Sequence, residues 1–156
     1  MPDHAPSFYE CRRDGFTVSD DSARLDLDFI HHALSEETYW AKGIPREVVE
    51  RAVRHSLCFG LYEDARQVGM ARVITDRATY AYLCDVFVAE SHRGRGLGAW
   101  LVECLLKHPD LQGLRRFSLL TKDAHELYQR FGFHAPEEPD NYMEIRWRNV
   151  YGRQNW

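Results

Sequence analysis

Residues 84–107 most constrain the fold, because they read as a buried strand, a glycine-rich loop and an amphipathic helix in succession. The strand contains "DVFVA", the loop is "SHRGRGLG", and the helix repeats apolar residues at helical spacing up to Pro109. A helix N-terminus leaves about four backbone N–H groups unpaired and carries roughly half a positive charge. Glycines let an anion approach those groups closely. The stretch therefore predicts a phosphate site, with a turn bearing incidental arginines as the alternative.

Two common phosphate motifs do not fit this loop. A Walker loop needs GxxxxGK followed by Ser or Thr, and "GRGLGAW" has neither the Lys nor the hydroxyl. A Rossmann fingerprint needs GxGxxG after the first strand of a βαβ unit. Here "GRGLG" follows β-rich runs at 56–63, 67–76 and 79–89, which short turns join and which predict three antiparallel strands.

The other patterns predict one domain spanning residues 1–156. The first dozen residues read as a frayed end or an edge segment, and residues 14–20 as a short strand. We expect a helix capped at Asp20–Ser22 and running to about residue 34, and a second helix with Pro45 at its first position. Further elements are expected as a strand at 115–121, a helix at 123–133 with Asp123 and Glu126 as a capping box, and a last strand in "YMEIRWR" at 142–148.

Composition narrows the class of protein. The chain has 20 Lys and Arg against 24 Asp and Glu, a net charge of -4, which argues against a nucleic-acid partner. Its apolar runs stop at about ten residues, short of the roughly 20 that cross a bilayer, so we expect no membrane association. Four cysteines without a CxxC pair favour reduced thiols and a cytoplasmic location. The histidines show no metal-ligand spacing, so we expect no metal site.

Two motifs resemble the GNAT superfamily of N-acetyltransferases. Arg93, Gly96 and Gly98 fit its signature of Arg or Gln, two residues, Gly, one residue, and Gly or Ala. About 30 residues later, "DAHELYQRFGF" matches a second family pattern at Ala124, Leu127, Tyr128, Gly132 and Phe133. The resemblance is tight over residues 56–133. It implies an α/β (α+β) fold with a mixed, mostly antiparallel central sheet, about four flanking helices, and a splay between the fourth and fifth strands.

The resemblance implies acetyl-CoA as cosubstrate. Its pyrophosphate is expected on the amides of the glycine loop, and its pantetheine arm in the slot between the splayed strands. The N–H of Val86 is expected to face the thioester carbonyl, where it would stabilise developing negative charge. The cofactor-binding residues expected from the resemblance are Val86, Phe87, Val88, Arg93, Gly94, Arg95, Gly96, Leu97, Gly98, Ala99, Thr121, Ala124 and Tyr128.

Acetyl transfer to an amine needs a proton donor for the departing thiol and an acceptor for the amine's proton. Tyr128 occupies the family's general-acid position, with plain aromatic packing as its alternative role. Asp85 interrupts an apolar strand, so we select it as base or water-orienting group, with a structural hydrogen-bonding role as the alternative. Some relatives carry an acid where this chain has Tyr82 or Arg116, and a common Asn is replaced by Thr121, so mechanistic detail does not transfer fully.

The acceptor is expected at the loop between the first two helices. Tyr39, Trp40 and Tyr82 are the candidate substrate-binding residues, and the first two serve as core plugs in the alternative interpretation. No Cys lies in a motif for an acetyl-enzyme, so direct attack by a primary amine of a small molecule or peptide is favoured. A non-catalytic CoA-binding module and a P-loop nucleotide binder remain the competing hypotheses. Oligomeric state stays open, with "YMEIRWR" and the aromatic C-terminus as candidate homodimer contacts.

Overall fold

A six-stranded sheet, with its strands in chain order, forms the centre of the molecule. The computed structural model describes residues 7–152. The strands are β1 (Glu10–Arg13), β2 (Phe16–Ser19), β3 (Leu57–Glu63), β4 (Arg66–Thr75), β5 (Tyr80–Val88) and β6 (Arg116–Leu119). Neighbouring strands run antiparallel, except that β6 runs parallel to β5. The expected mixed, mostly antiparallel sheet is confirmed, and residues 10–13 form its edge.

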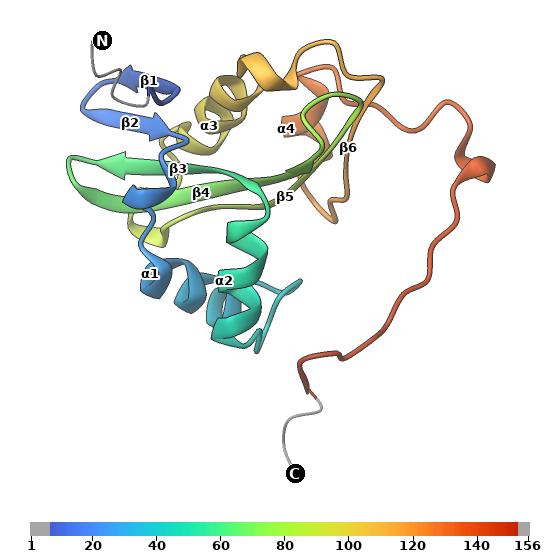
Figure 1. The fold of residues 1–156 in the computed structure, drawn as a ribbon, viewed down its shortest axis with the longest axis horizontal. Helices are drawn as coiled ribbons and strands as arrows, with labels where there is room; N and C mark the ends of the chain where they lie inside the picture. Colours follow the sequence, from blue (N-terminus) through green and yellow to red (C-terminus); the bar gives the residue numbers. More distant parts are fainter. Residues whose placement is uncertain (1–6, 153–156) are drawn as a thin grey trace, which may run out of the picture.

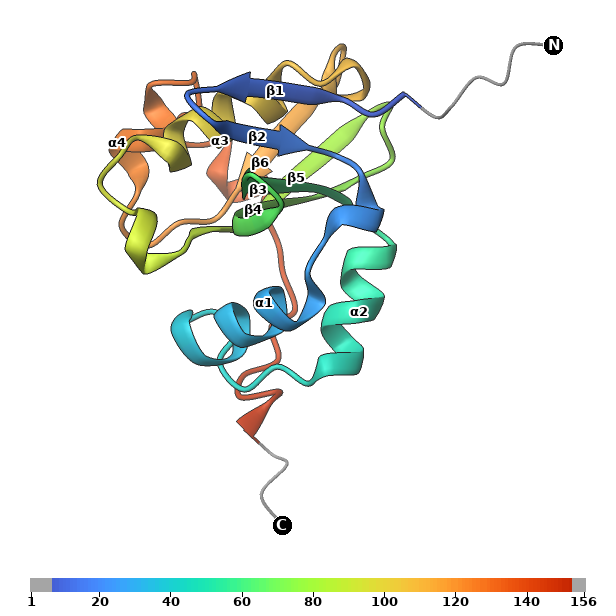
Figure 2. The same ribbon diagram turned by 90° about the vertical axis from the view of Figure 1, so that its left-hand side faces the viewer.

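Four α-helices cover the two faces of this sheet. Figures 1 and 2 show α1 (Leu27–His32) and α2 (Arg46–Arg54) below the sheet, and α3 (Leu97–Leu106) and α4 (His125–Gln129) above it. No helix among the described residues is long and apolar enough to cross a membrane. The sheet therefore lies between two helical layers, and each layer closes its own part of the core.

The hydrophobic core has two parts, one on each face. The larger part joins the sheet to α3 and α4, with Phe59, Leu101 and Leu105 fully buried. The smaller part joins the sheet to α1 and α2 through Ile30 and Val49. All four cysteines are free thiols, two of them buried. The central strands β3, β4 and β5 thus contribute residues to both parts of the core.

The helix starts differ from the sequence-based expectation. The N-cap of α1 is Asp26, whose Oδ1 accepts from the Phe29 N–H at 3.0 Å, because Asp21 caps a separate 3-10 turn at Ser22–Arg24. Pro45 is the extended N-cap of α2 rather than its first residue.

The capping box expected for the last helix is also absent. The helix α4 begins only at His125, and its N-cap Ala124 has no side-chain cap. The Thr121 hydroxyl accepts from the Ala124 N–H at 3.0 Å instead, which places Asp123 outside the helix. The expected Asp123–Glu126 capping box is wrong because a threonine three residues upstream already satisfies this turn.

The predicted last strand is wrong. Residues 142–148 have no strand partner, and no strand follows α4 within the described part of the chain, where a 3-10 turn forms at Pro139–Asn141. The segment runs away from the sheet on the right of Figure 1 before the chain returns toward the α1–α2 layer. There Tyr151 packs against the smaller core. Alternating apolar residues do not make a strand without a neighbour to pair its N–H and C=O groups.

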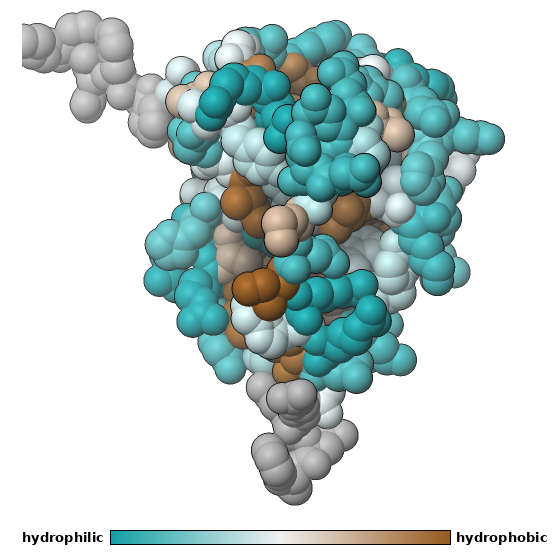
Figure 3. Space-filling view, turned by 90° about the vertical axis from the view of Figure 1, so that its right-hand side faces the viewer, coloured by the Kyte–Doolittle hydropathy of each residue, from teal (hydrophilic) through white to brown (hydrophobic). Residues whose placement is uncertain are grey.

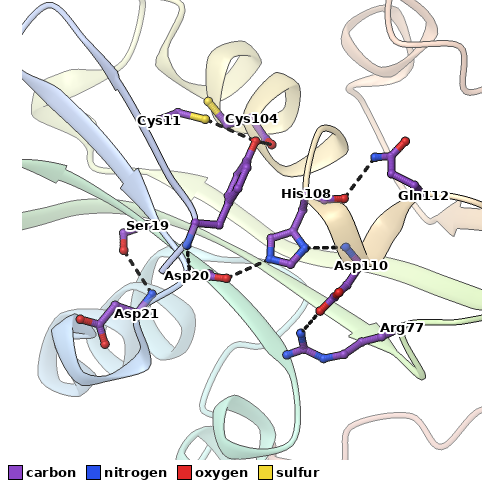
Figure 4. Close-up of polar contacts among 10 residues, drawn as sticks. Cys11, Ser19, Asp20, Asp21, Arg77, Cys104, His108, Asp110 and Gln112 are labelled. Atoms are coloured by element: carbon purple, nitrogen blue, oxygen red, sulfur yellow. Dashed lines mark hydrogen bonds and ion pairs between the residues drawn. The ribbon is translucent and has the colours of Figure 1, made fainter. Parts of the chain in front are cut away.

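A polar network fastens the β1–β2 edge to the helical layer above it (Figure 4). The Tyr9 hydroxyl donates to the Cys104 carbonyl at 2.7 Å, and the Tyr9 amide donates to Asp20 Oδ1 at 2.8 Å. The other oxygen of Asp20 accepts from His108 Nε2 at 2.9 Å, while His108 Nδ1 accepts from the Asp110 amide. Because His108 is buried and both ring nitrogens are occupied, this network is structural.

Candidate functional site

The glycine loop presents unpaired backbone amides to solvent. Gly94 and Gly96 have φ of 76° and 74°, in the left-handed region that glycine adopts without strain. Gly96 is the N-cap of α3 and has no side chain to cap the helix, so the N–H groups of Leu97, Gly98 and Ala99 lack intrahelical partners. The Leu97 side chain is buried in the core, so only its backbone faces the loop. The residues at 93–96 are exposed, as an anion cradle requires.

Side chains on both sides hold this loop in place. His92 is buried, and its Nε2 donates to Glu63 Oε2 at 2.8 Å while its Nδ1 accepts from the Ser91 hydroxyl at 2.7 Å. Arg93 Nε donates to the Val88 carbonyl at 3.0 Å. The Arg95 guanidinium lies 5.2 Å from the centre of the Phe16 ring. The loop is therefore anchored to the ends of β3 and β5 and to β2.

A split between β5 and β6 opens beside the loop. The two strands pair only from Tyr80 opposite Arg116 to Leu83 opposite Leu119. The remainder of β5, residues 84–88, has no strand partner on that side within the described chain. When the edge strand β1 is left out of the count, β5 and β6 are the fourth and fifth strands of the sheet. The expected splay between the fourth and fifth strands is therefore present. The free edge offers N–H and C=O groups to an extended ligand.

A β-bulge at Asp85 determines which way the following side chains point. Cys84 pairs with Arg72 and Phe87 with Met70, so two residues of β5 stand opposite one residue of β4. Asp85 itself has φ of 48°, which Asp tolerates better than most residues.

The bulge reverses the alternation along β5. Before it, Ala81 and Leu83 pack into the larger core, and after it Val86 and Val88 do, while Phe87 packs against the smaller core. All three of these last residues are half-buried. Without the bulge Asp85 would follow Leu83 into the larger core. The extra residue instead keeps its carboxylate out of that apolar environment.

The Asp85 carboxylate is held by two donors. Its Oδ2 accepts from Arg72 Nε at 2.7 Å and its Oδ1 accepts from the Trp40 indole N–H at 2.9 Å. The Arg72 and Asp85 side chains are only 16% and 9% exposed. Burial lowers the pKa of Arg72, but the Asp85 carboxylate outweighs this and the net pKa is raised. The bulge, the α1–α2 loop and β4 are thus joined at one carboxylate.

Tyr128 lies buried on α4 with its ring edge-on to Phe133 at 5.9 Å. Burial raises the pKa of its phenol above the usual value, and Tyr39 acts in the same direction. The Tyr128 hydroxyl has no hydrogen-bond partner among the described residues. The hydroxyl oxygen is not fully enclosed by protein. The phenol is therefore neutral at physiological pH and retains its proton for donation.

Two exposed aromatics connect these residues. Tyr39 lies edge-on to Trp40 at 5.0 Å, and the Lys122 ammonium lies 5.4 Å from the Tyr39 ring centre. Trp40 donates a hydrogen bond to Asp85, and Tyr39 contributes to the raised pKa of Tyr128. The α1–α2 loop therefore lies close to both the bulge of β5 and the helix α4. The core-plug interpretation of Tyr39 and Trp40 is wrong, since both side chains are exposed. Tyr82 lies on β5 and is half-buried.

Sequence reasoning missed Arg72, Ser56 and Lys122. Arg72 also donates from Nη1 to the Ser56 hydroxyl at 3.0 Å. A signal was present for Arg72, since it and Asp85 are the lone charges within the apolar runs at 67–75 and 80–88, and buried charges need partners. Nothing in the local sequence indicates Lys122, because its contact depends on how the β6–α4 turn meets a distant loop.

No group of His, Cys, Asp and Glu side chains within residues 7–152 is arranged to hold a metal ion. The site combines a glycine loop with uncapped helix amides, a free strand edge, a buried phenol and two exposed aromatic side chains. Together they suit a long ligand that carries phosphate at one end and a reactive group at the other.

Comparisons with known proteins agree on one family. The family described as "Acetyltransferase (GNAT) family" matches residues 25–133. A Gibberella zeae protein is 38% identical over 138 residues, covering 74% of this chain and 77% of that protein. A crystal structure of a GNAT-family protein from Xanthomonas campestris has 53% sequence identity and a TM-score of 0.86, covering 90% of this chain and 99% of that one. Both relatives are described as putative acetyltransferases.

A more distant structure shares the fold. It is a GNAT-family acetyltransferase from Elizabethkingia anophelis with acetyl-CoA bound, at 16% identity and a TM-score of 0.60, covering 88% of this chain and 91% of that one.

Proposed function

The chain belongs to the GNAT family of acetyltransferases, and we propose that it transfers the acetyl group of acetyl-CoA directly to a primary amine of a small molecule or peptide. The proposal rests on three features of the described residues, which we place together around the β5–β6 split. These are the uncapped amides of the glycine loop, the free edge of β5 and the buried phenol of Tyr128. Family membership supports acetyl transfer, and the geometry suggests how the residues share the work.

The loop and the split fit acetyl-CoA, which supplies an activated acetyl thioester. We propose that the amides from Arg93 to Ala99 hold its pyrophosphate and that the free edge of residues 84–88 pairs with its pantetheine amides. Half-buried Val86, Phe87 and Val88 would exclude water along this edge. The N–H of Val86, next to the bulge, would stabilise negative charge on the thioester oxygen. The acetyl-CoA in the Elizabethkingia anophelis structure supports the choice of cosubstrate.

Thr121 and Ala124 have a supporting part in this proposal. Their hydrogen bond fixes the turn that leads into α4. That turn leads into the helix that carries Tyr128. Their proposed contribution to cosubstrate binding is therefore to shape the wall of the pantetheine slot.

We propose Tyr128 as the general acid for the departing thiol. A thiol has a pKa of about 8.5 and a phenol one of about 10, so a neutral phenol beside the sulfur can donate as charge develops there. Burial keeps the Tyr128 phenol protonated.

We propose that Asp85 handles the acceptor's proton through an ordered water. A lysine-like amine is mostly protonated at pH 7, and its free form costs roughly 4–5 kcal/mol. Both oxygens of Asp85 already accept hydrogen bonds from the protein. A water that shares the remaining lone pairs of the carboxylate can relay the proton without breaking the Arg72 ion pair.

The acceptor is proposed to enter along Tyr39 and Trp40, with Tyr82 beside it on β5. Exposed aromatic faces bind cationic or apolar groups, and the Lys122–Tyr39 contact shows one such face already carrying a cation. An amine arriving there reaches the space between Asp85 and Tyr128. Four free thiols support a reducing, cytoplasmic setting for the reaction.

The test is release of CoA thiol from acetyl-CoA by the purified chain over a panel of primary amines. The proposal predicts thiol release that depends on both acetyl-CoA and at least one class of amine. It also predicts that CoA raises the melting temperature more than ATP with magnesium does. Binding of CoA without turnover on any amine would favour a non-catalytic CoA-binding module, and a larger shift with ATP would favour a nucleotide binder.

A further inference from the structure

Two of the four thiols lie together where the edge strand β1 meets the helix α3. Cys11 is on β1 and Cys104 is in the second half of α3, far away in the sequence. Both side chains pack in the larger core, where Cys104 is buried and Cys11 is half-buried. Figure 4 shows their sulfur atoms approaching each other from the strand and from the helix. The fold thus brings a pair of thiols into one contact.

Hydrogen bonds link the two cysteines. The Cys11 thiol donates to the Tyr9 hydroxyl oxygen at 3.4 Å, and that hydroxyl donates to the Cys104 carbonyl at 2.7 Å. Burial raises the pKa of the Cys104 thiol, and a side-chain hydrogen bond with the Cys11 thiol raises it further. The two thiols are therefore direct neighbours and also share one hydroxyl.

Contacts on either side align the strand with the helix. The Tyr9 hydroxyl reaches the Cys104 carbonyl, and the Arg13 guanidinium lies 4.9 Å from the centre of the Trp100 ring. Cys11 stands between Tyr9 and Arg13 on the same face, because alternate residues of an extended chain share a face. Cys104 follows Trp100 by four residues, which places both on one face of α3. The two cysteines thus belong to surfaces that pack directly on each other.

The surroundings of Cys11 favour a partner within the same chain. Its neighbours on β1 are Glu10, Arg12 and Arg13, all of them exposed and charged. Charges along an edge strand oppose pairing with a second copy. Figure 3 shows exposed apolar side chains on the side of the molecule that faces away from β1. A bond from Cys11 is therefore expected to stay within the chain.

The other two thiols have no comparable partner. Cys58 lies on β3 and Cys84 on β5, with β4 between them. Strands two places apart in a sheet lie roughly 10 Å from each other, beyond the about 7 Å that the Cα atoms of a disulfide allow. Cys58 also packs in the smaller core, on the opposite face of the sheet from Cys104.

We propose that Cys11 and Cys104 form a reversible intrachain disulfide when the chain meets a low-molecular-weight disulfide, for which oxidised glutathione is the probe. The half-buried Cys11, as thiolate, attacks one sulfur of the reagent, and one thiol leaves. The Cys104 thiol then loses its proton to solvent and attacks the Cys11 sulfur, which expels the second thiol. Two electrons pass to the reagent, and two protons from the protein balance the two thiols released.

Contact between the two sulfur atoms favours the second step. Cys104 is only 3% exposed, so a soluble reagent meets Cys11 first. A raised pKa makes Cys104 a slow nucleophile toward reagents in solution. Within the mixed disulfide its target is already adjacent, and attack within one chain replaces an encounter in solution. The proposal is independent of the catalytic function.

The first test treats the reduced full chain with oxidised glutathione at about pH 8. The digest is made with pepsin at low pH, where thiol exchange is slow. Mass spectrometry is predicted to show a chain lighter by two hydrogen atoms, and one cross-linked peptide pair joining Cys11 to Cys104. Dithiothreitol should restore the original mass. Cys58 and Cys84 should remain free for alkylation after unfolding.

Two variants separate the steps. Cys104→Ala is predicted to stop at the mixed disulfide, with one glutathionyl group retained on Cys11. Cys58→Ala is the matched control, a buried thiol outside the contact, and it should form the bridge as the wild type does. Circular dichroism of each reduced variant checks that the fold is intact.

Thermal unfolding measures whether the bond fits the fold. The bridge closes a loop of about 90 residues, so it restricts the unfolded chain and should raise the melting temperature by about 5 °C or more. Oxidised Cys104→Ala should show no such rise. A lower melting temperature in the bridged wild type would overturn the proposal, because the native contact would then have to break for the bond to form.

The wild-type product decides the remaining alternatives. A chain that keeps four alkylatable thiols overturns the proposal, as does one that retains a glutathionyl group on Cys11. A bridge between another pair of cysteines contradicts it. A covalent dimer on a non-reducing gel contradicts it too, because the bond would then join two chains.

Discussion

The phenol of Tyr128 is the group whose protonation matters most to the proposed chemistry. Burial and the neighbouring Tyr39 both raise its pKa, so the folded protein holds this proton beyond the ordinary phenol value of about 10. A function that needs the protonated phenol is therefore fully present below that value and is lost as the pH rises through the raised pKa. Burial thus delays loss of the Tyr128 proton as the pH rises, and it has no effect on the protonated phenol at low pH.

We predict that kcat of the wild type, at saturating amine, does not fall between pH 8 and pH 10 through loss of the Tyr128 proton. A decline is expected only above about pH 10, and it should be absent from the residual activity of Tyr128→Phe. The measurement is kcat against pH for both proteins. A decline centred near pH 9 that disappears in the variant would show that the phenol pKa is not raised.

The Arg72–Asp85 ion pair predicts a stability effect. Asp85→Asn leaves the buried guanidinium without its counter-charge, and loss of one partner of a buried pair costs about 3 kcal/mol. The free energy of unfolding from urea titration measures this. Arg46→Gln is the control, because Arg46 pairs with Asp28 and Glu50 in exposed positions and its loss should leave the urea midpoint unchanged. Equal midpoints for both variants would contradict the account.

Two thiols close to this ion pair are predicted to be unreactive. Burial raises the pKa of Cys58 and Cys84 to about 12 each. Since the thiolate is the reactive form, alkylation of these thiols at pH 8 should be about a thousandfold slower than in the unfolded chain. Peptide mass spectrometry after iodoacetamide treatment, with and without urea, measures both rates. Similar rates in the two states would show that the thiols are accessible and unperturbed.

At the scale of the elements, the glycine loop requires glycine at residue 96 because of its backbone conformation, and not because a side chain would lack room. A Cβ at Gly96 would meet no atom within 4 Å, yet its φ of 74° strains any other residue. The amides that follow it depend on this turn for their direction. A substitution of Gly96 is therefore expected to disturb the loop, although a larger side chain would not collide with neighbouring residues.

Gly96→Ala is predicted to raise KM for acetyl-CoA severalfold and to destabilise the fold by about 1 kcal/mol. Gly113→Ala is the matched control, because Gly113 has φ of 72°, has equal space and lies in the turn before β6. Both variants should lose similar stability, whereas only Gly96→Ala should weaken acetyl-CoA binding. Steady-state kinetics and thermal unfolding test this prediction. An unchanged KM for acetyl-CoA in Gly96→Ala would show that the glycine loop does not bind the cosubstrate.

The bulge shows how far local pattern can predict a strand. The β-rich run predicted β5 within about a residue of each end, and Asp85 was visible in it as a misplaced charge. The direction of its carboxylate was not predictable, because it depends on an extra residue in the register with β4. Its partners on β4 and on the α1–α2 loop become visible only when the strands are paired.

At the scale of the whole molecule, the topology of the sheet could be predicted from the order of the β-rich and helical runs along the chain, together with the resemblance that the glycine loop carries. The mixed, mostly antiparallel sheet, the four helices and the position of the split agree with expectation. Residues 142–148 do not, because alternation describes a strand's faces and says nothing about whether an edge is within reach. Helix starts also shifted by several residues, since several acidic side chains near 20–26 could each cap a turn.

The measurement that tests the central claim most directly compares CoA thiol release by the wild type and by Tyr128→Phe, together with the Kd of each for CoA. We predict that the wild type turns over with an amine and that the variant loses about 10²-fold or more in kcat. The Kd for CoA should remain within about twofold, because the loop amides are unchanged. Equal kcat in both proteins would contradict the account, since the buried phenol of α4 would then take no part in acetyl transfer.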